Sequence, residues 1–76
     1  MKDSTFDKFK DSLIRIAPNE FEATDPETGG KWIVRANMPI GEMMALYAIG
    51  DRIADENIAP APDSQVVVNF EIKIGE

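Results

Sequence analysis

The chain has 76 residues, of which 43% are hydrophobic and 29% charged, a composition that fits one globular domain and excludes a disordered acidic tail. Cysteine and histidine are both absent, which excludes disulfides, thiolate metal ligands and imidazole catalysis. Fourteen acidic against eight basic residues give a formal net charge of −6, which disfavours direct binding to nucleic acids or membranes and favours a protein partner with a basic surface.

The distribution of apolar residues bears on where in the cell the protein is expected. No apolar run approaches the roughly 18 residues of a membrane span, and the start lacks the basic-then-apolar pattern of a secretion signal. The lack of cysteine suits a reducing compartment. We therefore expect a cytoplasmic protein in which residues 1–76 form a single domain.

The first predicted element is a helix. Either Asp3 or Ser4 can cap it, and Pro18 ends it because proline removes a backbone donor. Four apolar residues between them recur at spacings of three, four and three, which places them on one helix face. They are Phe6, Phe9, Leu13 and Ile16.

A β-hairpin is predicted next, with strands at 21–24 and 31–36. Residues 25–30 between them have the composition of a turn, since they include a proline and two glycines that tolerate positive φ. On the second strand Trp32 and Val34 share one face, and Ile33 and Arg35 share the other. One of these pairs must leave the core unless the second face is also covered. Trp32 is either a core residue or, if it faces outward, a rigid anchor for a partner.

A second helix is predicted from about Pro39 to about Asn57. Proline fits a first turn, and Glu42 lies where the helix dipole favours an acid. The apolar residues of this helix form a stripe wider than one narrow face, so we expect part of it to meet a partner. They are Ile40, Met43, Met44, Leu46, Tyr47, Ile49 and Ile53.

The chain ends in a predicted strand, 66–74, after a stiff proline-containing connector at 59–63. Alternate residues of this strand are apolar, and Val67 adds an apolar side chain to the other face. If the strand lies at a sheet edge, it invites pairing with a second copy, so a homodimer is a further expectation.

These elements predict a small α+β domain in the order α-β-β-α-β, a three-stranded sheet with helices packed on one face. The pattern leaves open whether the last strand lies beside the first or the second strand of the hairpin.

The sequence contains no recognisable catalytic motif. The serines lack a histidine partner and a Gly-x-Ser-x-Gly turn, and Gly29-Gly30-Lys31 lacks the spacing of a phosphate-binding loop. Asp25 and Glu27 lack the alternation of a calcium loop. We therefore predict no catalytic residue, no metal site, no cofactor and no enzymatic activity.

Residues 21–46, FEATDPETGGKWIVRANMPIGEMMAL, resemble the start of the small tail-assembly chaperones of tailed bacteriophages over about a third of the chain. Those proteins often open with a short hairpin and a Pro-x-x-Glu type of helix start, matched here by Pro39 and Glu42. The resemblance implies a phage or prophage accessory protein that binds other proteins.

The function predicted is a noncatalytic acidic interaction module that binds and inhibits or chaperones a protein partner. The alternatives are an assembly subunit that acts as a homo-oligomer, and an acidic nucleic-acid mimic that blocks a basic DNA- or RNA-binding site. The predicted partner-binding residues are Trp32, Glu42, Met43, Tyr47, Asp51, Asp55 and Glu56.

Overall fold

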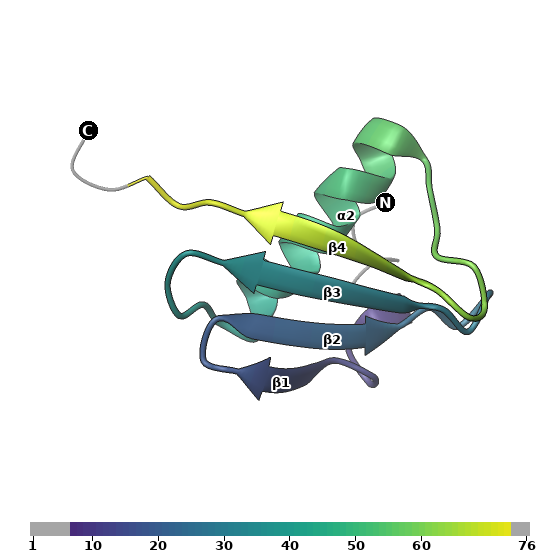
Figure 1. The fold of residues 1–76 in the computed structure, drawn as a ribbon, viewed down its shortest axis with the longest axis horizontal. Helices are drawn as coiled ribbons and strands as arrows, with labels where there is room; N and C mark the ends of the chain where they lie inside the picture. Colours follow the sequence, from purple (N-terminus) through teal and green to yellow (C-terminus); the bar gives the residue numbers. More distant parts are fainter. Residues whose placement is uncertain (1–6, 74–76) are drawn as a thin grey trace.

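The computed structural model describes residues 7–73. Within this range one mixed sheet has the strand order β1-β2-β3-β4 (Figure 1). Neighbours are antiparallel except for β3 and β4, which are parallel and joined through the helix α2. The bounds are β1 Ile14–Ala17, β2 Glu20–Thr24, β3 Lys31–Ala36, α2 Glu42–Glu56 and β4 Gln65–Phe70. The α+β class is as predicted, but in the described range the sheet has four strands instead of three.

The extra strand is β1, where the sequence predicted the second half of a helix. Residues 7–9 are helical, whereas the predicted start at Asp3 or Ser4 lies outside the described residues. Ile14 and Ile16 are β-branched and alternate with Arg15, a pattern that suits a strand. Pairing of Ile14 with Glu22 occupies the backbone groups along the outer edge of β2.

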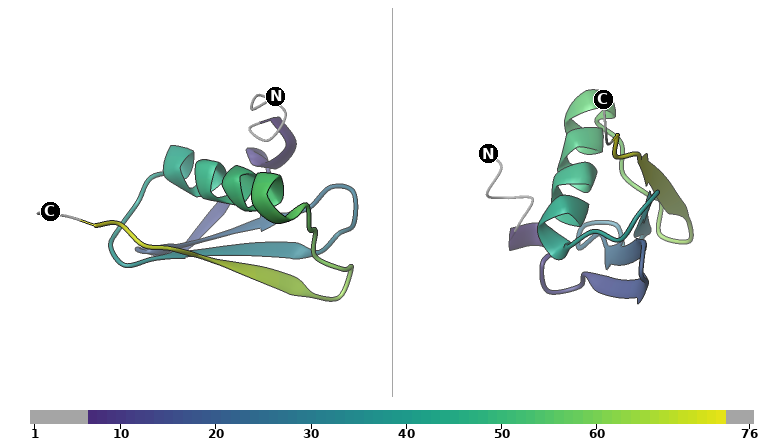
Figure 2. Two further views of the ribbon diagram at one scale, coloured as in Figure 1. Left: turned by 90° about the horizontal axis from the view of Figure 1, so that it is seen from above. Right: turned by 90° about the vertical axis from the view of Figure 1, so that its left-hand side faces the viewer.

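The short helical segment still reaches the core as its apolar spacing predicted. Phe9 is fully buried, and its ring meets the Trp32 ring edge to face with centroids 6.2 Å apart. Both this segment and α2 lie on the same face of the sheet (Figure 2), also as predicted. The opposite face carries no helix among the described residues.

The hairpin is confirmed as β2 and β3. Phe21 pairs with Val34 and Ala23 pairs with Trp32, which puts all four side chains on the helix-covered face. In the loop, the Gly29 N–H donates to the carbonyl of Asp25 at 2.8 Å. Gly29 has φ +82°, a conformation that other residues adopt only with strain.

The helix α2 begins later than its pattern predicted, because Gly41 is the N-cap and Pro39 precedes it. Glu42 occupies the first turn as expected. The helix ends where predicted: Asn57 takes a left-handed conformation and donates its N–H to the carbonyl of Ile53 at 2.7 Å. The residues that it buries are Ala45, Leu46, Ala48 and Ile49.

The last strand lies beside the second strand of the hairpin, which settles the order that the sequence left open. Val66 and Val68 pair with Trp32 and Val34 and complete the core face. The strand ends at Phe70, earlier than predicted, because β3 ends at Ala36 and offers no further backbone partner. Ile74, the last residue of the predicted strand, lies outside the described residues.

Beyond that point an amide side chain replaces the missing strand. Asn37 donates its Nδ2–H to the carbonyl of Ile72 at 2.8 Å and accepts the N–H of Ile72 at 2.9 Å. This reciprocal pair holds the segment after β4 in line with the sheet. Of the helices described, none is long and apolar enough to cross a membrane.

Candidate protein-binding surface

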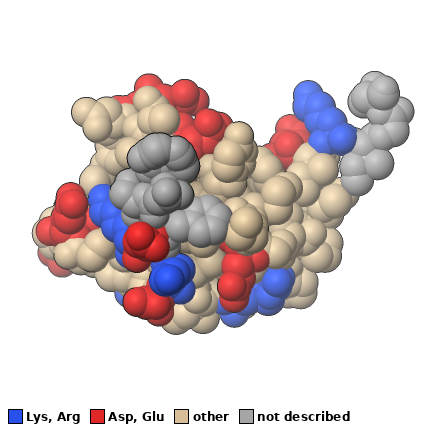
Figure 3. Space-filling model, turned by 180° about the vertical axis from the view of Figure 1, so that it is seen from behind, with Lys and Arg blue, Asp and Glu red and all other residues tan. Residues whose placement is uncertain are grey.

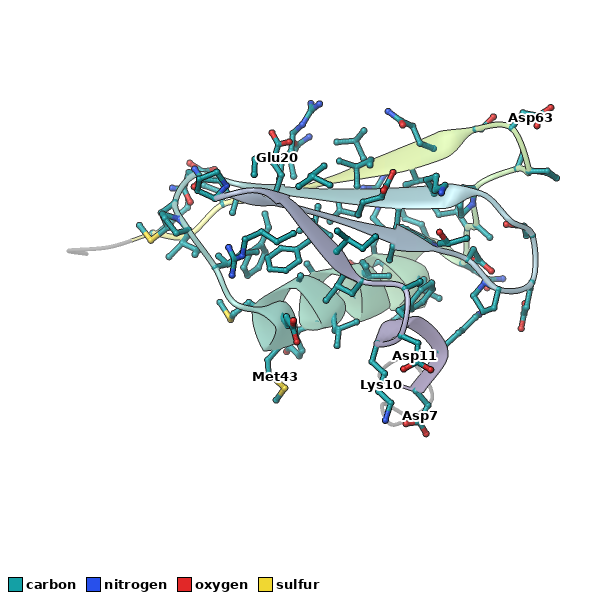
Figure 4. All side chains as sticks on the ribbon, turned by 90° about the horizontal axis from the view of Figure 1, so that it is seen from below. Asp7, Lys10, Asp11, Glu20, Met43 and Asp63 are labelled. Atoms are coloured by element: carbon teal, nitrogen blue, oxygen red, sulfur yellow. The ribbon has the colours of Figure 1, made fainter. Side chains whose placement is uncertain are left out.

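The side of α2 that faces away from the sheet carries large apolar side chains. Met43 is 65% exposed and Tyr47 67% exposed, and Figure 4 shows Met43 projecting away from the sheet at the start of α2. Gly50 and Ala54 follow at the spacings that keep residues on one helix face. We call Met43, Tyr47, Gly50 and Ala54 the outer stripe of α2. Met43 and Tyr47 belong to the wide apolar pattern seen in the sequence, of which Met44 is also exposed, at 40%.

The same helix carries several carboxylates. The exposed carboxylates of α2 are Glu42, Asp51, Asp55 and Glu56. The helix has one cation, Arg52, whose Nε lies 3.1 Å from Oε1 of Glu56. Seen from the helix-covered side, acidic residues gather near the end of α2, beside an uncharged surface (Figure 3).

The placement of these acids is unfavourable for the helix itself. The last turn of α2 has no basic residue, yet Asp55 and Glu56 lie there. A carboxylate near the negative end of the helix dipole costs about 0.3–1 kcal/mol. Arg52 offsets this cost for Glu56, with which it forms an ion pair, but no such pair is present for Asp55 among the described residues.

Trp32 does not belong to this surface. Its side chain is fully buried, and its Nε1–H donates to Oδ2 of Asp25 at 3.3 Å. Oδ1 of the same buried carboxylate accepts the N–H of Glu27 at 2.9 Å. The hypothesis that Trp32 anchors a partner is therefore wrong, because the faces of β3 alternate and the helix-covered face takes Trp32.

The sequence did not predict a second set of exposed apolar residues, on β1. Ile14 and Ile16 on β1 are 57% and 47% exposed. Arg15 between them lies over the Phe21 ring, with its guanidinium 4.6 Å from the ring centroid, on the core side. The signal that was available is the alternation of β-branched residues, which the helical spacing of Leu13 and Ile16 concealed.

A groove runs between α2 and β4, with a volume of about 150 Å³. Asp51 and Asp55 lie on its helix wall with Arg52, so the structure brings two of the predicted residues to one place. The other predicted residues of α2 lie outside this lining. The full lining is Ala48, Asp51, Arg52, Asp55, Val68, Asn69 and Phe70.

Another depression, of about 380 Å³, lies at the ends of β3 and β4 and includes Arg35 and Glu71 in its lining. Among residues 7–73, no three acidic, histidine or cysteine side chains are grouped so as to hold a metal ion.

Comparisons with family models, curated proteins and solved structures found no match to this chain. The resemblance to phage tail-assembly chaperones therefore rests on the quoted residues alone.

Proposed function

We propose that this chain is a noncatalytic interaction module that binds a protein through the outer stripe of α2 and the carboxylates around it. The observation that supports the proposal is the exposure of Met43 and Tyr47, each about two-thirds accessible, on a helix of 15 residues. Complete burial of such a side chain contributes about 1.5–3 kcal/mol, so burying the exposed part of each contributes about 1–2 kcal/mol to binding.

The partner in this proposal presents apolar side chains and basic groups together. The apolar groups cover Met43 and Tyr47, while basic groups face Asp51 and Asp55. Charge complementarity of this kind speeds association and excludes acidic competitors. In keeping with the resemblance described above, the module would act as a phage or prophage accessory protein that inhibits or chaperones its partner.

Site-specific photo-cross-linking in the source cell tests the proposal. A photoreactive benzoylphenylalanine at position 47 should capture a discrete product, and the same group at position 27, which is exposed in the hairpin loop, should not. Excess wild-type protein should compete the product away, whereas the M43A/Y47A double variant should compete at least about tenfold less well, from the loss of about 2–4 kcal/mol of apolar contact. Equal competition by the double variant would refute the proposal.

The exposed isoleucines of β1 favour a second candidate, the homo-oligomeric assembly subunit. An edge strand with Ile14 and Ile16 exposed is a surface on which copies of the chain can associate. This candidate requires a concentration-dependent dimer in sedimentation that becomes monomeric in the I14T/I16T variant. A monomer at all concentrations contradicts it and leaves the first proposal standing.

A further inference from the structure

The outer edge of β4 is unpaired among the described strands, since β4 is last in the sheet order (Figure 1). The N–H of Lys31 donates to the carbonyl of Ser64 at 3.1 Å, so the backbone groups of Ser64 face β3. Residues of a strand alternate between those whose backbone groups face one neighbour and those whose groups face the other. The outward groups of β4 are therefore those of Gln65, Val67 and Asn69.

A contact from α2 agrees with this assignment of the outward backbone groups. Arg52 donates an Nη1–H to the carbonyl of Val67 at 3.3 Å. The carbonyl that it reaches is one of the outward acceptors of the edge. Arg52 thus occupies a position that the N–H of an added strand would otherwise take.

The groove beside this edge is acidic on its helix wall. Arg52 is already engaged with Glu56 and Val67, and no basic side chain among the described residues forms an ion pair with Asp51 or Asp55. Both carboxylates are exposed. A cation that entered the groove would therefore meet unpaired negative charge.

The spacing of these carboxylates matches an extended chain. Asp51 and Asp55 are one helical turn apart, a rise of about 6 Å. Alternate side chains of a strand, which point to the same face, are about 6.5–7 Å apart. A strand with basic residues at alternate positions therefore brings one to each carboxylate while its backbone pairs with β4.

We infer that the free edge of β4 and the adjoining groove bind an extended basic segment of a partner protein, which adds to the sheet as a further strand. Its alternating Lys or Arg side chains pair with Asp51 and Asp55, and its backbone displaces Arg52 from Val67. Addition of a strand to a free sheet edge is an established mode of peptide recognition. This inference rests on the proposed function, of which it specifies the partner's chemistry and conformation.

A second copy of the chain suits this site less well. Two copies that each carry a net charge of −6 repel one another. The β4 side chains that would face the carboxylates of the other copy are Val66, Val68 and Phe70, none of which is cationic. Charge complementarity therefore selects a basic partner.

The test titrates the whole chain with the acetylated and amidated peptide TRVRVRT and follows the backbone amides by NMR at low salt. We expect the largest shift changes at Gln65, Val67 and Asn69. The D51N/D55N variant should bind about five- to tenfold more weakly, whereas the D7N/D11N variant, with the same change of charge, should differ less than about twofold. Removal of the competing cation in R52Q should strengthen binding about two- to fivefold.

Three results would overturn the inference. Equal weakening in both double variants would mean that only overall charge attracts the peptide. Equal binding of the peptide methylated at every backbone nitrogen would exclude strand addition. A dimer that protects the β4 edge amides without peptide would assign the edge to a second copy.

The outcomes for the two proposals are separable. Failure of the position 47 cross-link with retained peptide binding refutes the outer stripe of α2 alone. A competed cross-link with no peptide binding refutes the β4 edge alone.

Discussion

Gly30 is the position where the backbone of the hairpin loop meets the connector before β4. A Cβ placed on Gly30 would lie 2.6 Å from the Cβ of Pro60 and 2.7 Å from its carbonyl oxygen, and closer still to the carbonyl oxygen of Ala61. Ordinary contacts of a Cβ are 3.4–4 Å. Because these atoms belong to backbone and to a proline ring, none can rotate away. In the G30A variant the connector has to move.

The expected cost follows from this overlap. Overpacking by one methyl group costs about 1–3 kcal/mol, and rigid neighbours place G30A in the upper part of that range, at about 2–3 kcal/mol. A chain of 76 residues has a free energy of unfolding of about 4–11 kcal/mol, so the variant should still fold. With a urea m-value of about 1 kcal/mol/M, the unfolding midpoint falls by about 2–3 M.

Urea unfolding followed by the fluorescence of Trp32 measures this change, and amide shifts at Ser64 and Val66 report the moved connector. The matched control is G29A, since Gly29 has φ +82° but open space around its Cβ. That variant should lose about 1 kcal/mol from backbone strain alone. If G30A costs no more than G29A, the connector does not pack on Gly30 and the reasoning is refuted.

Three further substitutions test other contacts. W32F removes the indole donor from the buried carboxylate of Asp25 and should lower the free energy of unfolding by about 2–3 kcal/mol, measured by circular dichroism in urea; a loss below about 1 kcal/mol contradicts the role of that hydrogen bond. N37A removes both bonds to Ile72 and should cost about 1 kcal/mol or less, with hydrogen exchange of the Ile72 amide at least about tenfold faster; unchanged exchange would show that the clamp does not hold the segment. G41S supplies the side-chain cap that α2 lacks and should add a few tenths of a kcal/mol to stability in the same urea assay, whereas destabilisation would argue against Gly41 as the N-cap.

Elements whose signals are local could be predicted from the sequence. The β2–β3 hairpin follows from turn residues between two strand-like runs, and α2 follows from the period of its apolar residues. The end of α2 at Asn57 was also correct, since asparagine adopts the left-handed conformation that closes a helix. These features depend on residues close in sequence, so the pattern contains the information.

The segment before the hairpin shows where local patterns fail. Residues 9–16 satisfy a helical spacing through Phe9, Leu13 and Ile16, and residues 14–16 also satisfy the alternation of a strand. Pairing with the outer edge of β2 decides between helix and strand, because β1 forms hydrogen bonds to the backbone groups of that edge. Because that edge exists only in the assembled sheet, the local pattern does not contain the answer.

The sequence by itself determined that this small chain has more apolar residues on α2 than one narrow face can bury, together with an excess of acids. Only the tertiary structure decided which of them are exposed: Trp32 is inside, Met43 and Tyr47 are outside, and Asp51 and Asp55 line the groove beside β4. The physical reason is that burial depends on contacts between elements far apart in the chain. The parallel pairing of β3 with β4 sets α2 over the sheet and leaves a strand edge beside its acidic end.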